Sequence, residues 1–151
     1  MQESLFTLSE IQIKYNPKVP TLQRPRITNS QDANNQLRLL MDEKQLNIRE
    51  ESAVLFLNRG NRVIGGFKVS SKGLTGTVMD IRLILAVALK CLATEIVIAH
   101  THPSGQLVPS QADKELTNRF KTAAECMDIR VYDHLIITED SYFSFADDGI
   151  L

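Results

Sequence analysis

Apolar and polar residues follow several different spacings along the chain, and each spacing predicts one type of secondary structure. From residue 51, "ESAVLFLN" and "NRVIGGFKVS" lie on either side of the turn "NRGN", which predicts two paired strands. "EIVIAH", residues 95–100, is a continuous apolar run rich in β-branched residues and favours a strand buried on both faces. "IRVYDHLIIT" and "SYFSF" predict two more strands near the end of the sequence.

Three other segments place apolar residues three or four positions apart, as amphipathic helices do. Each follows a residue type that caps helix N-termini, namely Ser30, Asp80 and Ser110. The expected inner faces are Ala33, Leu37 and Leu40 in the first helix, Ile81, Ile84, Leu85, Ala88 and Leu92 in the second, and Leu116, Phe120, Ala123, Ala124 and Met127 in the third. Helices alternating with strands predict an α/β sandwich with a mixed sheet.

The first 29 residues have a different pattern. "EIQIKY" alternates Ile11, Ile13 and Tyr15 with polar residues, which predicts a half-buried strand. "NPKVPTLQRPR" holds three prolines and predicts an extended arm. We therefore divide the chain into an N-terminal strand and arm, residues 1–29, and one domain, residues 30–151. Within that domain, "SSKGLTG" predicts a loop shaped by Gly73 and Gly76.

Composition narrows the functional classes. The 151 residues suit a single domain, and 17 basic against 18 acidic residues give a net charge of −1. This balance does not favour direct nucleic-acid binding, although it leaves a local basic patch open. "LILAVAL" is too short to cross a bilayer, and "MQESLFTLSE" lacks the pattern of a signal peptide. With two cysteines and no C-x-x-C motif, we expect a reduced, cytoplasmic protein.

The stretch "HTHPSGQLVPSQAD" carries the candidate chemistry. His100 and His102 are two positions apart at a strand end, so both rings leave the same face. Pro103 and Gly105 turn the following loop back, which places Asp113 on the first turn of the next helix. Two imidazoles and a carboxylate form a catalytic zinc site when a fourth position stays open for water. A proton-transferring carboxylate is also needed.

Two features leave alternatives open. Ser110 and Asp113 also resemble a capping box, in which Asp113 would only stabilise the helix end. Glu50 and Glu51 both precede the first hairpin strand, but they point to opposite faces, so at most one can serve as the base.

The same stretch resembles the JAMM pattern, in which His-x-His-Pro is followed after six residues by Ser and after two more by Asp. Together with "EESAVLFLNRGNRVIGG" and "DHLIITEDSYFSFADDGIL", it resembles the RadC-like branch of the JAB/MPN fold over residues 30–151. The resemblance implies a single-domain, cytidine deaminase-like α-β-α sandwich around a mixed sheet.

The resemblance also implies residue roles. His100, His102 and Asp113 would bind Zn²⁺, Ser110 would help to hold the oxyanion, and Glu50 rather than Glu51 would be the general base. The implied activity is that of a zinc metalloprotease acting on peptide or isopeptide-linked protein substrates.

Other residues receive structural interpretations. Thr101 stands where the family usually has Asn and should face away from the metal. Asp133 and His134 recur in the family, but a structural role at the strand entry is favoured over catalysis. Glu51 is expected to be a solvated strand residue.

Three functions therefore compete. The leading one is the zinc metallohydrolase. The second is a RadC-type DNA-repair or mobile-element-associated factor that acts as an interaction module without peptidase activity. The third is a zinc-stabilised scaffold. Exposed edge strands leave assembly into a homodimer open.

Overall fold

A mixed five-stranded sheet forms the centre of the protein in a computed structural model, with strand order β2-β1-β3-β4-β5. The structure describes residues 8–10, 12, 14–72 and 79–151, with the backbone alone for residues 70–72. The strands are β1 (Glu50–Leu57), β2 (Val63–Lys72), β3 (Glu95–Thr101), β4 (Arg130–Ile137) and β5 (Tyr142–Ser144). The hairpin around "NRGN" and the other strands predicted from residue 51 onward are confirmed.

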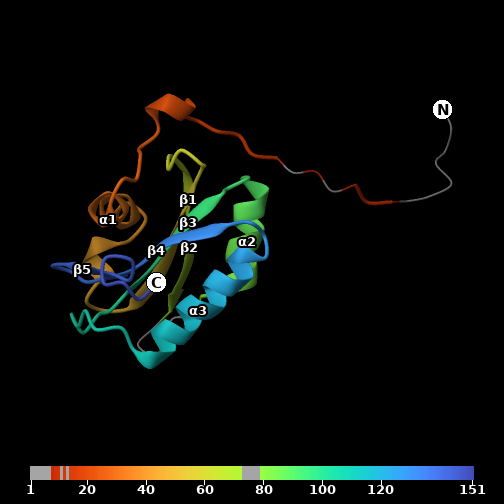
Figure 1. Ribbon diagram of the computed structural model, residues 1–151. Helices are drawn as coiled ribbons and strands as arrows, with labels where there is room; N and C mark the ends of the chain where they lie inside the picture. Colours follow the sequence, from red (N-terminus) through yellow and green to blue (C-terminus); the bar gives the residue numbers. More distant parts are fainter. Residues whose placement is uncertain (1–7, 11, 13, 73–78) are drawn as a thin grey trace, which may run out of the picture.

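Helices cover both faces of the sheet (Figure 1). α1 (Ser30–Arg38) packs on one face, while α2 (Ile81–Lys90) and α3 (Gln111–Glu125) pack on the other. Two short 3₁₀ turns, η1 (Thr21–Gln23) and η2 (Glu43–Gln45), precede β1. The predicted α/β sandwich with a mixed sheet is confirmed, and each face has its own apolar core.

Strand direction follows from the connections. β1 pairs antiparallel with β2 through a tight turn and antiparallel with β3, while β3 and β4 are parallel. A parallel pair needs a long crossover, which α3 and its loops supply. The ladder between β3 and β4 has a register shift, because Ile96 pairs with Val131 but Val97 pairs with Asp133. Tyr132 is therefore an extra residue in β4, a β-bulge.

Alternation along the strands assigns side chains to the two faces. Ser52 pairs with His100 and Ile98 pairs with His134, so these side chains belong to the face covered by α2 and α3. Glu50, two residues before Ser52, lies on the same face. The C-terminal end of β3 thus brings polar side chains to the edge of an otherwise apolar layer.

Helix boundaries differ from the prediction at four positions. Leu40 lies beyond the end of α1, although it still packs against the core on that face. Asn29 rather than Ser30 caps α1, because its side chain accepts the Asp32 amide hydrogen bond. Leu92 and Met127 lie beyond the ends of α2 and α3 and are 73% and 50% exposed, so they do not belong to the inner faces. Leu92 has φ of 57°, which ends the helical path.

Within residues 10–15, the residues that the structure describes do not form the predicted N-terminal strand. Ile11 and Ile13 lie outside the described residues, and neither Gln12 nor Tyr15 belongs to a strand. The Tyr15 hydroxyl instead donates a 2.8 Å hydrogen bond to the Ile64 carbonyl, which ties the arm to β2 by a side chain. In the predicted loop "SSKGLTG", residues 70–72 continue β2 and the remainder, with Gly73 and Gly76, lies outside the described residues.

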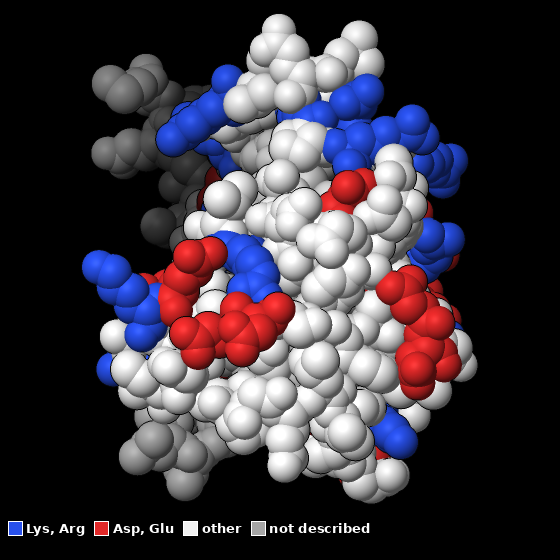
Figure 2. Space-filling model, turned by 90° about the vertical axis from the view of Figure 1, so that its left-hand side faces the viewer, with Lys and Arg blue, Asp and Glu red and all other residues white. Residues whose placement is uncertain are grey.

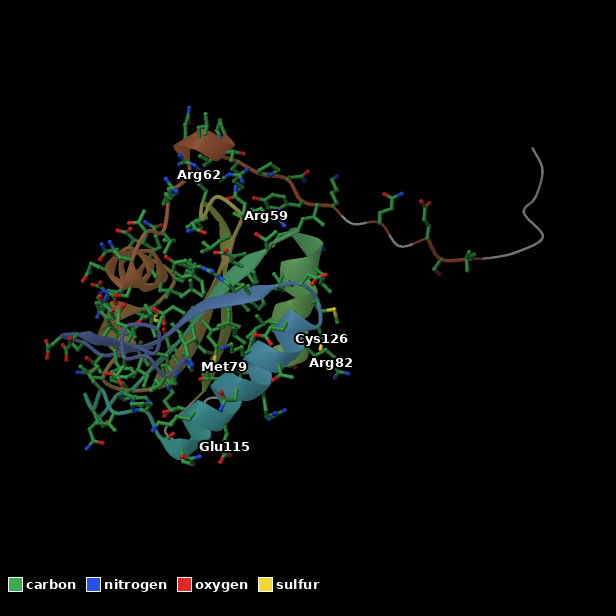
Figure 3. The ribbon with its side chains drawn as sticks, viewed as in Figure 1. Arg59, Arg62, Met79, Arg82, Glu115 and Cys126 are labelled. Atoms are coloured by element: carbon green, nitrogen blue, oxygen red, sulfur yellow. The ribbon has the colours of Figure 1, made fainter. Side chains whose placement is uncertain are left out.

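Basic side chains gather at one end of the molecule, where the arm and the β1–β2 turn meet (Figure 2). Arg62 is held there by hydrogen bonds to the carbonyls of Leu22 and Arg24. Arg59 and Arg62 lie at the opposite end from Met79 and Glu115 (Figure 3). Within the described part of the chain, no helix combines the length and apolar character needed to cross a membrane.

Candidate metal centre

The two histidines are positioned by the end of β3 and the loop that follows. His100 is the sixth residue of β3 and is 5% exposed, while His102 comes just after the strand and is half-buried. The backbone amide of His102 still donates to the Ile137 carbonyl at 3.0 Å, which holds it beside β4. Gly105 then turns the chain with φ of 78° and donates its amide to the His102 carbonyl.

Asp113 reaches the histidines from the first turn of α3. Its Oδ1 lies 3.2 Å from His100 Nε2, and its Oδ2 lies 3.4 Å from His102 Nε2. The capping box is also present: Ser110 Oγ accepts from the Asp113 amide, and Asp113 Oδ2 accepts from the Ser110 amide. The two alternatives from the sequence are therefore compatible, because the cap aims the carboxylate at the rings.

The spacing of the three side chains fits a small metal ion. Zinc–nitrogen and zinc–oxygen bonds of about 2.0–2.2 Å at tetrahedral angles separate neighbouring ligand atoms by about 3.3 Å. The separations here are 3.0 Å between the two Nε2 atoms and 3.2 and 3.4 Å from each to the carboxylate. Among the described residues, His100, His102 and Asp113 form a group that could hold a metal ion.

The charge of the cluster favours a bound cation. Burial alone raises the pKa of Asp113, but the close contacts of its carboxylate with His100 and His102 outweigh burial and hold this pKa well below the usual range. The bond to Asp113 likewise raises the pKa of His102 above its ordinary value, against the effect of burial. An ionised carboxylate and converging ring nitrogens therefore attract a proton or a metal ion to one point.

Glu50 and Glu51 occupy different environments, although they are neighbours in the chain. Glu50 is half-buried and lines a cavity of about 440 Å³, together with His100, His102, Ser110 and Asp113. The negative charge of Glu50 contributes to the raised pKa of His102. The arrangement brings the predicted base to the predicted ligands.

Glu51 is on the opposite face and is 2% exposed, so the expectation of a solvated side chain is wrong. Its Oε1 forms a 3.0 Å ion pair with Lys68 Nζ, and its Oε2 accepts the Asp42 amide at 3.2 Å. A carboxylate needs such partners when it leaves water.

Thr101 faces away from the histidines, as predicted, but it is connected to the site. Its Oγ1 accepts the Glu51 amide at 2.8 Å and donates to the Arg49 carbonyl at 3.3 Å. These two bonds fix the backbone on both sides of Glu50.

Asp133 and His134 occupy opposite faces of β4. Asp133 accepts hydrogen bonds from Ser144 Oγ and the Ala146 amide, which matches the structural role favoured from the sequence, and burial raises its pKa. His134 instead lies beneath the candidate metal ligands, with its Nε2 2.8 Å from His100 Nδ1. Burial lowers the pKa of His134 well below its ordinary value, which keeps the ring neutral. Sequence reasoning missed this contact.

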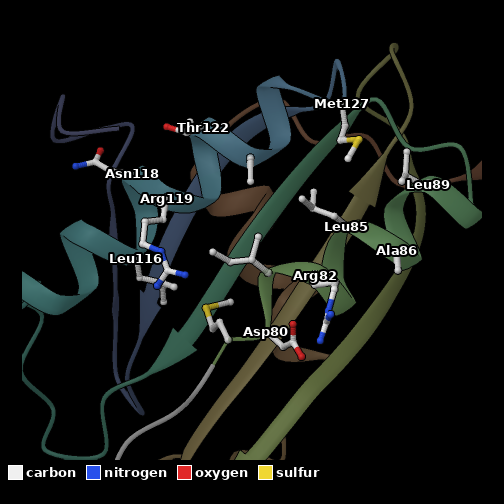
Figure 4. Close-up of a pocket in the computed structure, with 13 residues that line it drawn as sticks. Asp80, Arg82, Leu85, Ala86, Leu89, Leu116, Asn118, Arg119, Thr122 and Met127 are labelled. Atoms are coloured by element: carbon white, nitrogen blue, oxygen red, sulfur yellow. The ribbon is translucent and has the colours of Figure 1, made fainter.

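A larger groove adjoins the cavity and shares Met79 and Leu116 with it. It lies between α2 and α3, encloses about 1220 Å³ and is floored by apolar side chains such as Leu85 (Figure 4). Arg82 and Arg119 contribute to its two walls, one from each helix.

The fold and the site define an α/β protein with a mixed sheet and a candidate His-His-Asp metal centre at a strand end. Residues 27–150 match the family described as the RadC-like JAB domain. The chain belongs to this family.

Curated relatives agree with this assignment. The chain is 45% identical over 129 residues to a UPF0758 protein of Flavobacterium johnsoniae, covering 85% of this chain and 55% of that protein. It is 38% identical over 135 residues to a UPF0758 protein of Porphyromonas gingivalis, covering 89% and 60%. The match to UPF0758 protein YeeS of Escherichia coli K12 is 42% identical over 103 residues, covering 68% and 70%. The chain thus spans little more than half of the first two relatives.

Proposed function

We propose that this protein is a zinc-dependent metallohydrolase that cleaves peptide or isopeptide bonds. The observation that carries the proposal is the convergence of His100, His102 and Asp113 in one cavity with Glu50. Two nitrogen ligands and one oxygen ligand suit zinc, and three protein ligands are the usual number in catalytic zinc sites. Bound zinc would polarise the substrate carbonyl and lower the pKa of water.

Glu50 has the position required of a proton carrier. Its side chain lines the cavity from β1, across from the ligands on β3 and α3. A carboxylate there can accept a proton from the attacking water and give it to the leaving amine. Glu51 is on the other face of β1, where it pairs with Lys68. Glu50 is therefore the carboxylate of this strand that faces the candidate metal ligands.

The Ser110 hydroxyl can donate a hydrogen bond to the substrate. Its Oγ already accepts the Asp113 amide at 3.0 Å, so the acceptor function is engaged while the O–H remains a donor. From the mouth of the cavity, that donor would stabilise the negative oxygen formed from the substrate carbonyl.

The adjoining groove supports a polypeptide as the substrate. It continues from the cavity through Met79 and Leu116, and its apolar floor suits extended chain segments larger than one residue. A polypeptide substrate bound across Leu116 would place the residues on one side of its scissile bond in the cavity and those on the other side in the groove.

The test combines metal analysis with one matched pair of variants. Wild type, Glu50→Gln and Glu115→Gln are purified without chelators and assayed for zinc and for cleavage of peptide and isopeptide-linked substrates. Glu115 is an exposed glutamate of α3 that pairs with Gln111, so its variant repeats the chemical change away from the cavity.

We expect about one zinc per chain in all three proteins. Glu50→Gln should lose activity by about 10²–10⁴-fold, while Glu115→Gln stays active. Full activity in Glu50→Gln, or cleavage that resists removal of the metal, would refute the mechanism. Zinc binding without hydrolysis of any substrate tested would favour the zinc-stabilised scaffold instead.

A further inference from the structure

We propose that His134 and Thr117 are positioning residues that fix the tautomer of His100 and so direct its Nε2 lone pair toward the metal. The inference rests on the proposed metal site and adds two residues to it. A neutral histidine carries its proton on one of two nitrogens, and only the other nitrogen can bind a metal.

Hydrogen bonds link Asp113 to His100 through Thr117 and His134. The donor of each bond can be assigned by starting from Asp113. The backbone carbonyl of Asp113 can only accept, so Thr117 Oγ1 donates to it over 2.7 Å. The Thr117 hydroxyl has a single proton, which this bond uses. The 2.6 Å contact between Thr117 Oγ1 and His134 Nδ1 therefore requires a proton on His134 Nδ1.

The same reasoning continues through His134. Its ring is fully buried and stacks on Phe145, with ring centroids 4.5 Å apart, and such burial disfavours a charged imidazolium. A neutral ring protonated at Nδ1 has its lone pair on Nε2. His100 Nδ1, 2.8 Å away, must then be the donor.

His100 consequently has no proton on Nε2, the atom 3.0 Å from His102 Nε2 and 3.2 Å from Asp113 Oδ1. The Nδ1 of His102 donates to the Gln106 carbonyl at 2.8 Å, which leaves its Nε2 as the atom that shares a proton with Asp113. Once a metal ion replaces that proton, both rings direct Nε2 lone pairs to one point.

The series of bonds also links two ligands. It begins at the backbone carbonyl of Asp113 and ends at His100, so α3 and β3 are connected through β4. Metal-binding histidines are usually oriented by a carboxylate or a carbonyl. Here a neutral histidine and a hydroxyl perform that role.

The test uses paired variants and readouts that do not depend on hydrolysis. His134→Phe preserves an aromatic ring but cannot accept from His100, while His134→Gln offers both an acceptor and a donor. Thr117→Val removes the hydroxyl, while Thr117→Ser retains it. Phe120→Leu, in the core on the same helix, is the control for general loss of packing.

Two measurements are made on the folded proteins. Nitrogen-15 NMR of the metal-free protein reports which ring nitrogen of each histidine is protonated. Zinc affinity is measured by competition with a chelator. We expect protonated Nδ1 on His100 in the wild type, and about 10–100-fold weaker zinc binding in His134→Phe and Thr117→Val. His134→Gln should recover part of the loss, and Thr117→Ser and Phe120→Leu should bind zinc as the wild type does.

A proton on His100 Nε2 in the wild type, or unchanged zinc affinity in His134→Phe, would overturn the inference even if the enzyme is active. The proposed function fails separately, through the Glu50 variants or the absence of metal-dependent hydrolysis. A protein that is inactive but shows the expected tautomer and affinity changes would still support the roles of His134 and Thr117.

Discussion

Asp113 and Ser110 hold each other through two reciprocal hydrogen bonds, and the same carboxylate lies within 3.4 Å of both candidate metal-binding rings. The helix cap and the candidate ligand are therefore one structural unit. Substitutions can separate the two functions, because the cap needs an acceptor while the metal also needs a charge.

We predict that Asp113→Asn removes most of the bound zinc at little cost in stability, since an amide oxygen can still accept the Ser110 amide. Ser110→Ala should have the opposite effect, lowering the free energy of unfolding by about 1 kcal/mol with the zinc retained. Zinc analysis and urea unfolding of the metal-free proteins would measure both. Equal zinc loss in the two variants would contradict the separation.

Thr101 gives a second prediction, because its hydroxyl fixes the backbone on both sides of Glu50. Thr101→Val should lower kcat by about tenfold, which corresponds to about 1.4 kcal/mol, without changing zinc content. Thr101→Ser retains the hydroxyl and should remain close to wild type. Steady-state kinetics that separate kcat from KM would test this, and an unchanged kcat in Thr101→Val would exclude a role in holding Glu50.

The ion pair between Glu51 and Lys68 leads to a prediction about stability. Lys68→Met leaves a carboxylate that is 2% exposed without its cation, which should cost about 1–3 kcal/mol, less than a fully buried pair because Lys68 is 40% exposed. Lys68→Arg should cost little. Adding Glu51→Gln to Lys68→Met should recover part of the loss in chemical unfolding, and a purely additive double variant would argue against a direct pair.

The buried Asp133 carboxyl should make the stability of the protein depend on pH. Burial raises the pKa of this carboxyl in the folded protein, so the folded state binds its proton more readily than the unfolded state. Stability from this group is therefore present below its unfolded pKa and is lost as pH rises through the folded pKa. Each unit of difference corresponds to about 1.4 kcal/mol.

Asp133→Asn removes this titration. Relative to that variant, the wild type should become less stable as pH rises from about 4 through the raised pKa of Asp133. Urea unfolding of both proteins across this range would show the trend, since other titrating groups affect the two alike. A difference that stays constant with pH, or grows in favour of the wild type, would disprove it.

Local patterns predict most of the elements and the candidate ligand set. His100, His102 and Asp113 belong to one strand, one loop and one helix start, so their convergence follows from neighbouring chain geometry. The capping residue of α1 and the ends of α2 and α3 differ by a few positions, since helix ends depend on side-chain hydrogen bonds and on single residues such as Leu92 with positive φ.

Long-range contacts account for the errors. Glu51 is buried because Lys68 and the Asp42 amide meet it, and neither partner can be assigned from the sequence of β1. His134 reaches His100 through the pairing of β3 with β4, which are separated by the whole of α3. Alternation within β4 shows that Asp133 and His134 face opposite sides, but it does not show which one faces the candidate metal ligands.

The extra residue at Tyr132 decides that question, and it thereby sets the formal charge beneath the candidate metal ligands. Without the bulge, Ile98 would pair with Asp133, and a carboxylate would accept the proton of His100. A carboxylate acceptor increases electron donation from the ring and weakens the Lewis acidity of the metal. With His134 in that place, the centre carries one negative charge fewer, and a bound metal ion would be a stronger electrophile.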